Sequence, residues 1–214
     1  MQHKHQTHNI EELQRIFALA TTAKGPVHAN IPMEEPLYGM TNTPLAFPPT
    51  PSIQPAAFDT TFEDFVLAWK NASRKMILMG VSKPSARLTA MLNDLLQDPS
   101  VIILTEKTSN YSHPNAVTAI DCLMAPIELE HNGGEAELKP DLLITVGGMI
   151  VSKKIKFFLR KHQASQHLHV DETKANDTFY HLSKHIYAPA VNAFSAISDL
   201  AHRAESNYQA TVLK

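Results

Sequence analysis

Short apolar runs separated by amphipathic stretches are the feature that most constrains the fold of this chain. Such runs lie at 76–81, 101–104 and 142–146, and two further strands are predicted at 167–170 and 185–187. A strand that is apolar throughout, rather than at alternate positions, is buried on both faces. Because helical patterns separate these runs, the sequence predicts an α/β fold: a doubly wound parallel sheet with helices on both faces.

Capping signals indicate where the helices around the first strand begin. Thr60 with Glu63 is typical of a capping box ahead of one helix. Ser82 with Pro84 predicts the start of the helix that follows the strand. A third helix is predicted from about Ser152 to Lys161.

The beginning of the chain has a different organisation. Asn9 to Ala23 is predicted to be a helix, because Asn9 can cap it with Glu12 three residues on. Val27–Ile31 is predicted to be a short buried strand. Half of the 14 prolines fall between residues 32 and 55, a density that excludes regular helix and sheet.

These differences predict three parts. Residues 1–31 are expected to be the closing helix and strand of a preceding domain, because a lone helix and strand make an unusual start for a domain. Residues 32–58 are interpreted as a Pro-rich linker, and residues 59–214 as the central α/β domain.

Composition excludes several classes of function. The formal net charge is -2, without the basic excess that nucleic-acid partners require. No apolar run reaches the roughly 20 residues of a membrane helix, so no membrane span is predicted. The N-terminus lacks the apolar core of a signal peptide, and the single cysteine fits a reducing compartment. We therefore expect a cytoplasmic protein.

Several ordered blocks carry a family resemblance. They are Gly25–Pro32, Glu35–Tyr38, Lys75–Gly80, Pro140–Gly148 and His167–Asp171. The first resembles the segment Gly-Pro-Val-His-x-Asn-x-Pro that closes the first domain of thiamine-diphosphate-dependent enzymes. The second is similar to the menaquinone-pathway synthases of that family. The resemblance covers essentially the whole chain in order.

The resemblance implies a reaction for the parent protein. It implies a transferase, dependent on thiamine diphosphate and Mg²⁺, that decarboxylates 2-oxoglutarate and adds the product to isochorismate in menaquinone biosynthesis. The implied partners are further domains of the same chain, on both sides, and other copies in a homo-oligomer. The family holds its cofactor with Gly-Asp-Gly and Asn-Asn, and neither occurs in this sequence. The chain is therefore expected to bind neither cofactor nor metal, to have no catalytic residue and to be inactive alone, serving as scaffold and as one basic wall of the substrate site.

The strand–glycine–helix junction after residue 146 is the strongest local candidate for a binding site. Lys153 and Lys154 fall in the first helical turn, where the helix dipole disfavours cations. Two lysines there are explained if an anion binds between them, and both implied substrates are dicarboxylates. Gly148, Ser152, Lys153 and Lys154 are therefore predicted to bind substrate. The alternative is a solvated helix start whose lysines face water.

A polar loop after the second strand is the other candidate. Thr105, Ser109 and Asn110 are expected to line the same crevice, because ligands of open α/β sheets bind at the carboxyl ends of strands. The alternative is an ordinary surface loop. Cys122 and Phe157 are predicted to be core residues. The 12 histidines give no closing ligand set, so no metal site is predicted.

Two other functions remain open at this stage. Related central domains in the superfamily hold FAD or ADP, so the chain is alternatively a module that binds a nucleotide or a small effector. It lacks the Gly-x-Gly-x-x-Gly nucleotide fingerprint. The remaining alternative is an unrelated α/β protein with a chance match.

Overall fold

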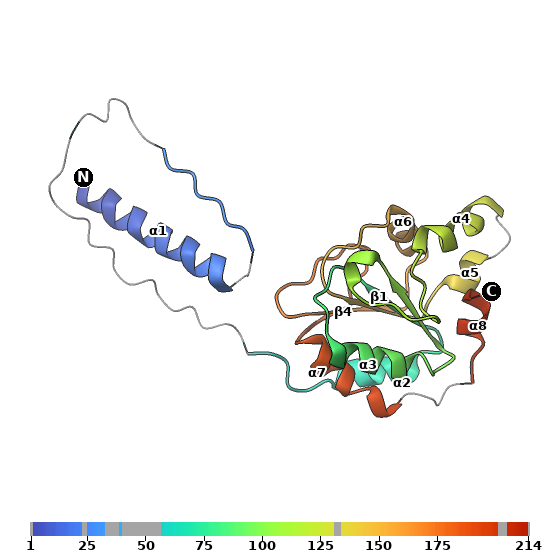
Figure 1. The fold of residues 1–214 in the computed structure, drawn as a ribbon. Helices are drawn as coiled ribbons and strands as arrows, with labels where there is room; N and C mark the ends of the chain where they lie inside the picture. The colour runs from blue at the N-terminus through green and yellow to red at the C-terminus, as the bar shows by residue number, and fades with distance from the viewer. Residues whose placement is uncertain are drawn as a thin grey trace. The chain divides into compact units, whose positions relative to one another are not determined.

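The structure, a computed structural model, describes residues 2–22, 25–32, 39, 57–130, 134–200 and 205–213. The chain divides into two units, Met1–Ala57 and Phe58–Lys214, coloured blue and cyan-to-red in Figure 1. Most of the predicted linker lies outside the described residues. The assignment of residues 1–31 to a preceding domain stays a prediction.

The first unit differs from the sequence-based expectation in two ways. Helix α1 runs from Gln2 to Thr22, so Asn9 lies inside the helix and is not its cap. Glu12 pairs with the Arg15 guanidinium at 2.7 Å instead. The predicted strand at Val27–Ile31 was wrong, and both end residues are exposed. A strand needs a neighbour for its hydrogen bonds, and residues 2–22 and 25–32 contain none.

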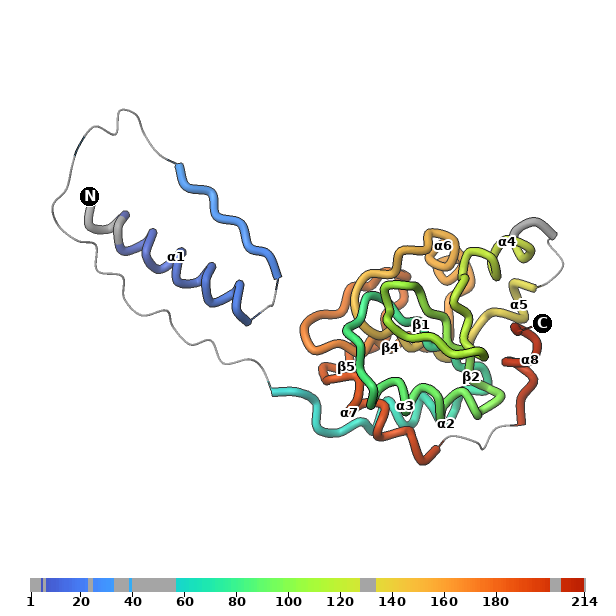
Figure 2. The backbone as a smooth tube through the Cα atoms, viewed as in Figure 1, coloured from blue at the N-terminus to red at the C-terminus, as the bar shows by residue number. Residues whose placement is uncertain are grey.

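The second unit is built on one sheet of five strands. These are β1 (Lys75–Met79), β2 (Val101–Thr105), β3 (Leu142–Val146), β4 (Gln166–Asp171) and β5 (Lys184–Tyr187). Their order is β2-β1-β3-β4-β5 and every pair is parallel, which confirms the predicted parallel sheet (Figure 2). All carboxyl ends therefore lie along one edge, and the strand order reverses between β1 and β3.

Burial on both faces explains why these strands are apolar. Every residue of β1, β2 and β3 is buried. Alternate side chains enter two separate cores: Ile77 and Ile144 contribute to one, Met76 and Leu143 to the other. This pattern confirms that helices cover both faces of the sheet.

Each core is closed by its own set of helices (Figure 1). The first contains α2 (Glu63–Asn71), α3 (Ala86–Leu95) and α7 (Ala190–Ser195), followed by a 3₁₀ turn at Ser198–Leu200. The second contains α4 (Ile120–Glu130), α5 (Gly134–Leu138), α6 (Lys153–Lys161) and α8 (Tyr208–Val212). A second 3₁₀ turn, η1 (Lys107–Ser109), follows β2.

Two predicted helix starts were displaced by tertiary structure. Helix α2 begins after Phe62, without a side-chain cap, so the predicted capping box at Thr60 is wrong. Phe62 packs against the first core, and that contact sets the helix start. Helix α3 is capped by Ser85, three residues later than Ser82, and the Ser85 hydroxyl accepts a hydrogen bond from the Leu88 N–H.

Two predicted core residues are exposed. Helix α6 buries Ile155 and Phe158, so Phe157, on a different face of the helix, is 67% exposed. Cys122 is likewise exposed on α4, where Met124 supplies the buried contact. Both errors have one cause: a short apolar run does not show which of its residues faces the sheet.

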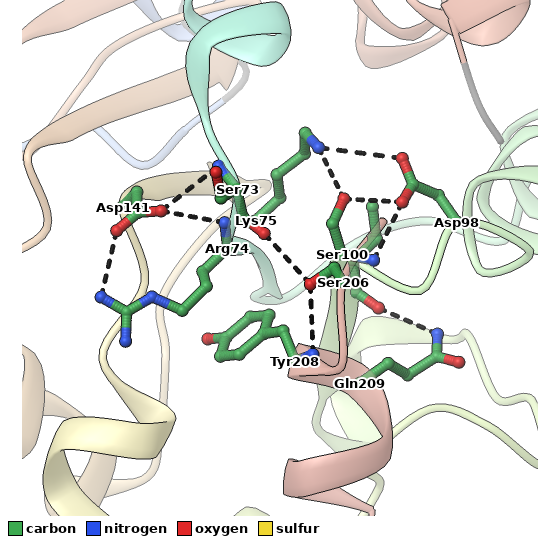
Figure 3. Close-up of polar contacts among 10 residues, drawn as sticks. Ser73, Arg74, Lys75, Asp98, Ser100, Asp141, Ser206, Tyr208 and Gln209 are labelled. Carbon is green, nitrogen blue, oxygen red and sulfur yellow. Dashed lines mark hydrogen bonds and ion pairs between the residues drawn. The ribbon is translucent and has the colours of Figure 1, made fainter. Parts of the chain in front are cut away.

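A buried ion pair lies at the amino edge of the sheet, the end opposite the candidate site (Figure 3). The Lys75 ammonium lies 2.6 Å from the Ser100 hydroxyl and 3.7 Å from the Asp98 carboxylate. The Ser100 hydroxyl also lies 2.6 Å from Asp98. Both charged side chains are at least 96% buried. Burial lowers the pKa of Lys75, and the nearby Asp98 charge opposes that shift.

The last described segment is attached at this same edge. The Gln209 amide donates to the Val101 carbonyl at 2.9 Å, and the buried Tyr208 hydroxyl donates to the Leu138 carbonyl at 2.7 Å. Asp141 accepts the backbone N–H of Arg74 at 3.0 Å (Figure 3). The amino edge is therefore fixed by polar contacts from four different segments.

Removing one partner of the buried pair should be costly. Asp98→Ala leaves the Lys75 charge buried without its carboxylate, and we expect a loss of about 3–5 kcal/mol of unfolding free energy. Urea unfolding followed by circular dichroism measures it.

The matched control is the exposed pair of Lys184 and Asp64. Asp64→Ala should cost less than about 1 kcal/mol, because solvent screens that pair. Equal losses in the two variants would show that the buried pair has no special role.

Candidate functional site

Two loops interlock at the carboxyl edge, where the strand order reverses. The Gly80 N–H donates to the Val146 carbonyl at 2.9 Å, and the Gly148 N–H to the Val81 carbonyl at 2.8 Å. A Cβ on Gly80 would lie 2.1 Å from the Gly148 oxygen, and Gly147 has a φ of 77°. Ligands of open α/β sheets usually occupy this crevice. Here the backbones of the loops after β1 and β3 fill the crevice, so space for a ligand lies beside these loops and not between them.

The start of α6 is closed by side chains of this same chain. Ser152 caps the helix: its hydroxyl accepts from the Ile155 N–H at 3.2 Å and lies 2.5 Å from the Asp121 carboxylate. The Glu106 carboxylate accepts the N–H of Val151 at 2.9 Å and that of Ser152 at 2.7 Å. A carboxylate from the loop after β2 therefore occupies the position where an external anion was expected.

The remaining predicted residues of this junction lie at the surface. Gly148 is exposed in the turn, and Lys153 and Lys154 are the first two residues of α6. Lys153 is exposed and Lys154 is half-buried. The structure thus places Gly148, Ser152 and both lysines on one short segment, while their role in binding substrate stays a prediction.

The predicted pocket loop makes its polar contacts within the chain. The Thr105 hydroxyl donates to the Tyr111 carbonyl at 3.1 Å, and the Ser109 hydroxyl to the Met79 carbonyl at 2.7 Å. Asn110 has a left-handed backbone, and its amide donates to the Ser82 carbonyl at 2.7 Å. These side chains hold the loop against the end of β1.

A cavity of about 530 Å³ lies on the other side of the interlocked loops, above β3 and β4. Its polar lining includes Lys156, Arg160, His169, Asp171, Lys174 and Tyr180. The Arg160 guanidinium lies 4.6 Å from the centre of the Tyr180 ring. The sequence analysis did not predict this cavity, because its lining comes from α6, from β4 and from the segment after β4, and that last segment carries no motif.

Thr145 and His169 line this cavity, and the Thr145 hydroxyl lies between His169 and the buried His167. The Thr145 hydroxyl lies 2.9 Å from His167 Nε2 and 2.8 Å from His169 Nδ1. His167 is 1% exposed, and among the described residues its Nδ1 has no hydrogen-bond partner. Burial lowers the pKa of His167 from 6.5 to about 4. It also lowers the pKa of His169.

The described ranges contain neither a side-chain cluster suited to a metal ion nor a helix suited to a membrane. Within those ranges, no group of three or more His, Cys, Asp or Glu side chains is placed to hold a metal ion. No helix in them has the length and apolar character needed to cross a membrane.

The buried His167 predicts how stability depends on pH. The unfolded chain binds a proton at His167 near pH 6.5, whereas the folded chain does so only near pH 4. This contribution is therefore fully present above pH 6.5 and is lost as the pH falls toward 4, by up to about 3 kcal/mol. Urea unfolding at several pH values between 7.5 and 4.5 measures the loss.

His167→Gln removes this titration, so its unfolding free energy should fall less steeply over the same range. His28→Gln replaces an exposed histidine and should behave like the unmodified protein. If His167→Gln shows the same slope as the unmodified protein, the loss has another source.

Comparison with known proteins was made by sequence. No family model matches the chain. A protein of Flavobacterium psychrophilum named 2-succinyl-5-enolpyruvyl-6-hydroxy-3-cyclohexene-1-carboxylate synthase is 39% identical over 206 residues, which cover 94% of this chain and 36% of that protein. Proteins of the same name from Christiangramia forsetii and Flavobacterium johnsoniae are 42% and 40% identical, over 84% and 83% of this chain.

The matched part of each relative is a fraction of its length. The alignments cover 32% of both the Christiangramia forsetii and the Flavobacterium johnsoniae proteins. The three relatives share one name and match in the range of 39–42% identity. The chain therefore belongs to the family of 2-succinyl-5-enolpyruvyl-6-hydroxy-3-cyclohexene-1-carboxylate synthases, and it spans about a third of the length of these relatives.

Proposed function

We propose that this chain is the central α/β part of such a synthase, where it serves as a scaffold and supplies one basic wall of the substrate site. The complete enzyme decarboxylates 2-oxoglutarate and adds the product to isochorismate. The observation that carries the proposal is the match over 94% of this chain to a third of a synthase. The parallel sheet supports the proposal, because it brings the carboxyl ends of the strands to one edge, where α6 begins with two lysines.

The catalytic cofactor belongs to the rest of the enzyme in this proposal. Thiamine diphosphate, with Mg²⁺, supplies the carbanion chemistry when bound. Neither Gly-Asp-Gly nor Asn-Asn occurs in these 214 residues, so they offer no fit for the cofactor. No step of the reaction is assigned to this chain.

The contribution of the chain is charge at a defined position. Lys153 and Lys154 begin α6 at the carboxyl edge, and the exposed Lys153 is available to a dicarboxylate brought there by the other domains. Gly148 leaves room at the turn. Ser152 is proposed to bind substrate beside the lysines, and Thr105, Ser109 and Asn110 to line the same crevice, while their hydrogen bonds fix the loops that carry the site.

A chimeric enzyme tests this function. Residues 58–214 replace the matching segment of the Flavobacterium psychrophilum synthase, and product formation is measured with thiamine diphosphate, Mg²⁺, 2-oxoglutarate and isochorismate. We expect turnover by the chimera and none by the 214-residue chain alone. Lys153→Ala/Lys154→Ala in the chimera should raise the KM of one substrate about tenfold, as expected for one lost charge contact.

The matched control is Lys70→Ala, which removes an exposed lysine from α2. It should leave both KM values unchanged. Turnover by the isolated chain, or an equal effect of the two sets of lysine variants, would contradict the proposal.

The cavity above β3 and β4 favours a second candidate, a module that binds an anionic small molecule such as a nucleotide. Its volume of about 530 Å³ is in the usual range for small-molecule sites. Three cationic side chains, Lys156, Arg160 and Lys174, line it beside Tyr180. A phosphate group would meet the cations, although Asp171 and Asp177 also line the cavity and the Arg160 guanidinium already lies over one face of the Tyr180 ring.

Thermal unfolding with ADP or FAD tests this candidate. A ligand at one hundred times its Kd should add about 2.7 kcal/mol to the unfolding free energy. Arg160→Ala should abolish the gain, whereas Arg87→Ala, on the exposed surface of α3, should retain it. Absence of any saturable gain with either nucleotide would remove nucleotide binding from consideration.

A further inference from the structure

We infer that Glu106 is a positioning residue: its carboxylate fixes the backbone immediately before α6, so that the side chains of Lys153 and Lys154 are held in place for a substrate anion. The inference rests on the proposed role of Lys153 and Lys154. It concerns a different residue, on a different loop, and it is carried by the contacts that Glu106 makes.

Glu106 makes hydrogen bonds to the segment after β3 and within its own loop after β2. On one side its carboxylate accepts the N–H groups of Val151 and Ser152, at 2.9 and 2.7 Å. On the other side it caps η1, where its side chain accepts from the Ser109 N–H and its own N–H donates to the Ser109 hydroxyl at 3.0 Å. That hydroxyl donates to the Met79 carbonyl at the end of β1. The Glu106 side chain therefore joins the segment after β3 to the loop after β2, and Ser109 connects that loop to the end of β1.

This arrangement changes how the helix start meets an anion. The unpaired N–H groups of a first turn, together with the helix dipole, normally attract a negative ligand. Here Glu106 takes two backbone N–H groups, and the Ser152 hydroxyl takes that of Ile155. The backbone from which the Lys153 and Lys154 side chains extend is therefore fixed on both sides, and the helix start already carries the negative charge of Glu106.

The same contacts also fit a second arrangement, in which substrate displaces Glu106. Glu106 would then stand in the place of the substrate carboxylate and leave when substrate arrives. The geometry favours positioning, because Glu106 is also bonded to Ser109. Ser109 is 1% exposed, and its hydroxyl donates to the Met79 carbonyl of β1. A carboxylate that must leave has no need of that second attachment.

Amide hydrogen exchange of the 214-residue chain tests the contact directly. In Glu106→Ala the amides of Val151 and Ser152 should exchange at least about tenfold faster, since each loses a charge-assisted hydrogen bond. Glu106→Gln keeps an acceptor oxygen and should show a smaller increase. Glu137→Gln, an exposed glutamate on α5, is the matched control and should change neither amide. Unchanged exchange at both amides in Glu106→Ala would overturn the inference.

Titration with 2-oxoglutarate, followed by amide chemical shifts, separates positioning from substitution. In the unmodified chain we expect shifts at Lys153 and Lys154 while the Val151 and Ser152 amides stay bonded to Glu106. Glu106→Ala should weaken this binding about fivefold or more, and Glu106→Gln should partly restore it. Tighter binding by Glu106→Ala, or displacement of Glu106 from both amides by the dicarboxylate, would overturn the inference.

The same titration keeps the two proposals distinguishable. If Lys153→Ala/Lys154→Ala leaves the shifts unchanged, the basic wall is refuted, while the exchange result still decides whether Glu106 fixes the helix start. If the lysine variant abolishes binding and Glu106→Ala has no effect on it, the basic wall stands and the positioning role fails.

Discussion

Burial of the sheet on both faces is the constraint on which the rest of this structure depends. Since β1, β2 and β3 are buried along their whole length, solvent and ligands reach these three strands only at their two ends. Parallel pairing places all strand starts at one edge and all strand ends at the other. Polar chemistry in this unit is consequently concentrated in two places with different tasks.

The amino edge is organised for stability. There the Lys75–Asp98 pair is enclosed, Asp141 fixes the start of β1, and Gln209 attaches the last described segment. At the carboxyl edge, carboxylates and hydroxyls hold the loops in place, and the Lys153 side chain is exposed. A substitution that weakens the first edge need not alter the second, because the sheet lies between them.

The sequence predicted the sheet because its signal is local: each apolar run of β1, β2 and β3 is readable without its neighbours. The same local signal led to the prediction of Ser152 and the lysines as site residues, since strand, glycine turn and helix are consecutive. It did not find Glu106, which meets Val151 across 45 residues. Neither segment has a sequence pattern that predicts its contact with the other. The errors at Thr60, Ser82 and Cys122 are of one kind, because each ignored a tertiary contact that decides between neighbouring positions.

The single hydroxyl of Thr145 gives the histidine cluster a direction. It has one proton and faces two imidazole nitrogens, so it can donate to one ring only and must accept from the other. Donation to His169 leaves His167 with a bare Nδ1 lone pair, which is easier to bury than an orphaned N–H. His169 Nδ1 then accepts the threonine proton, so the hydrogen of this neutral ring lies on Nε2. The orientation of the Thr145 hydroxyl thus sets the tautomer of both rings, including that of His169, which lines the cavity.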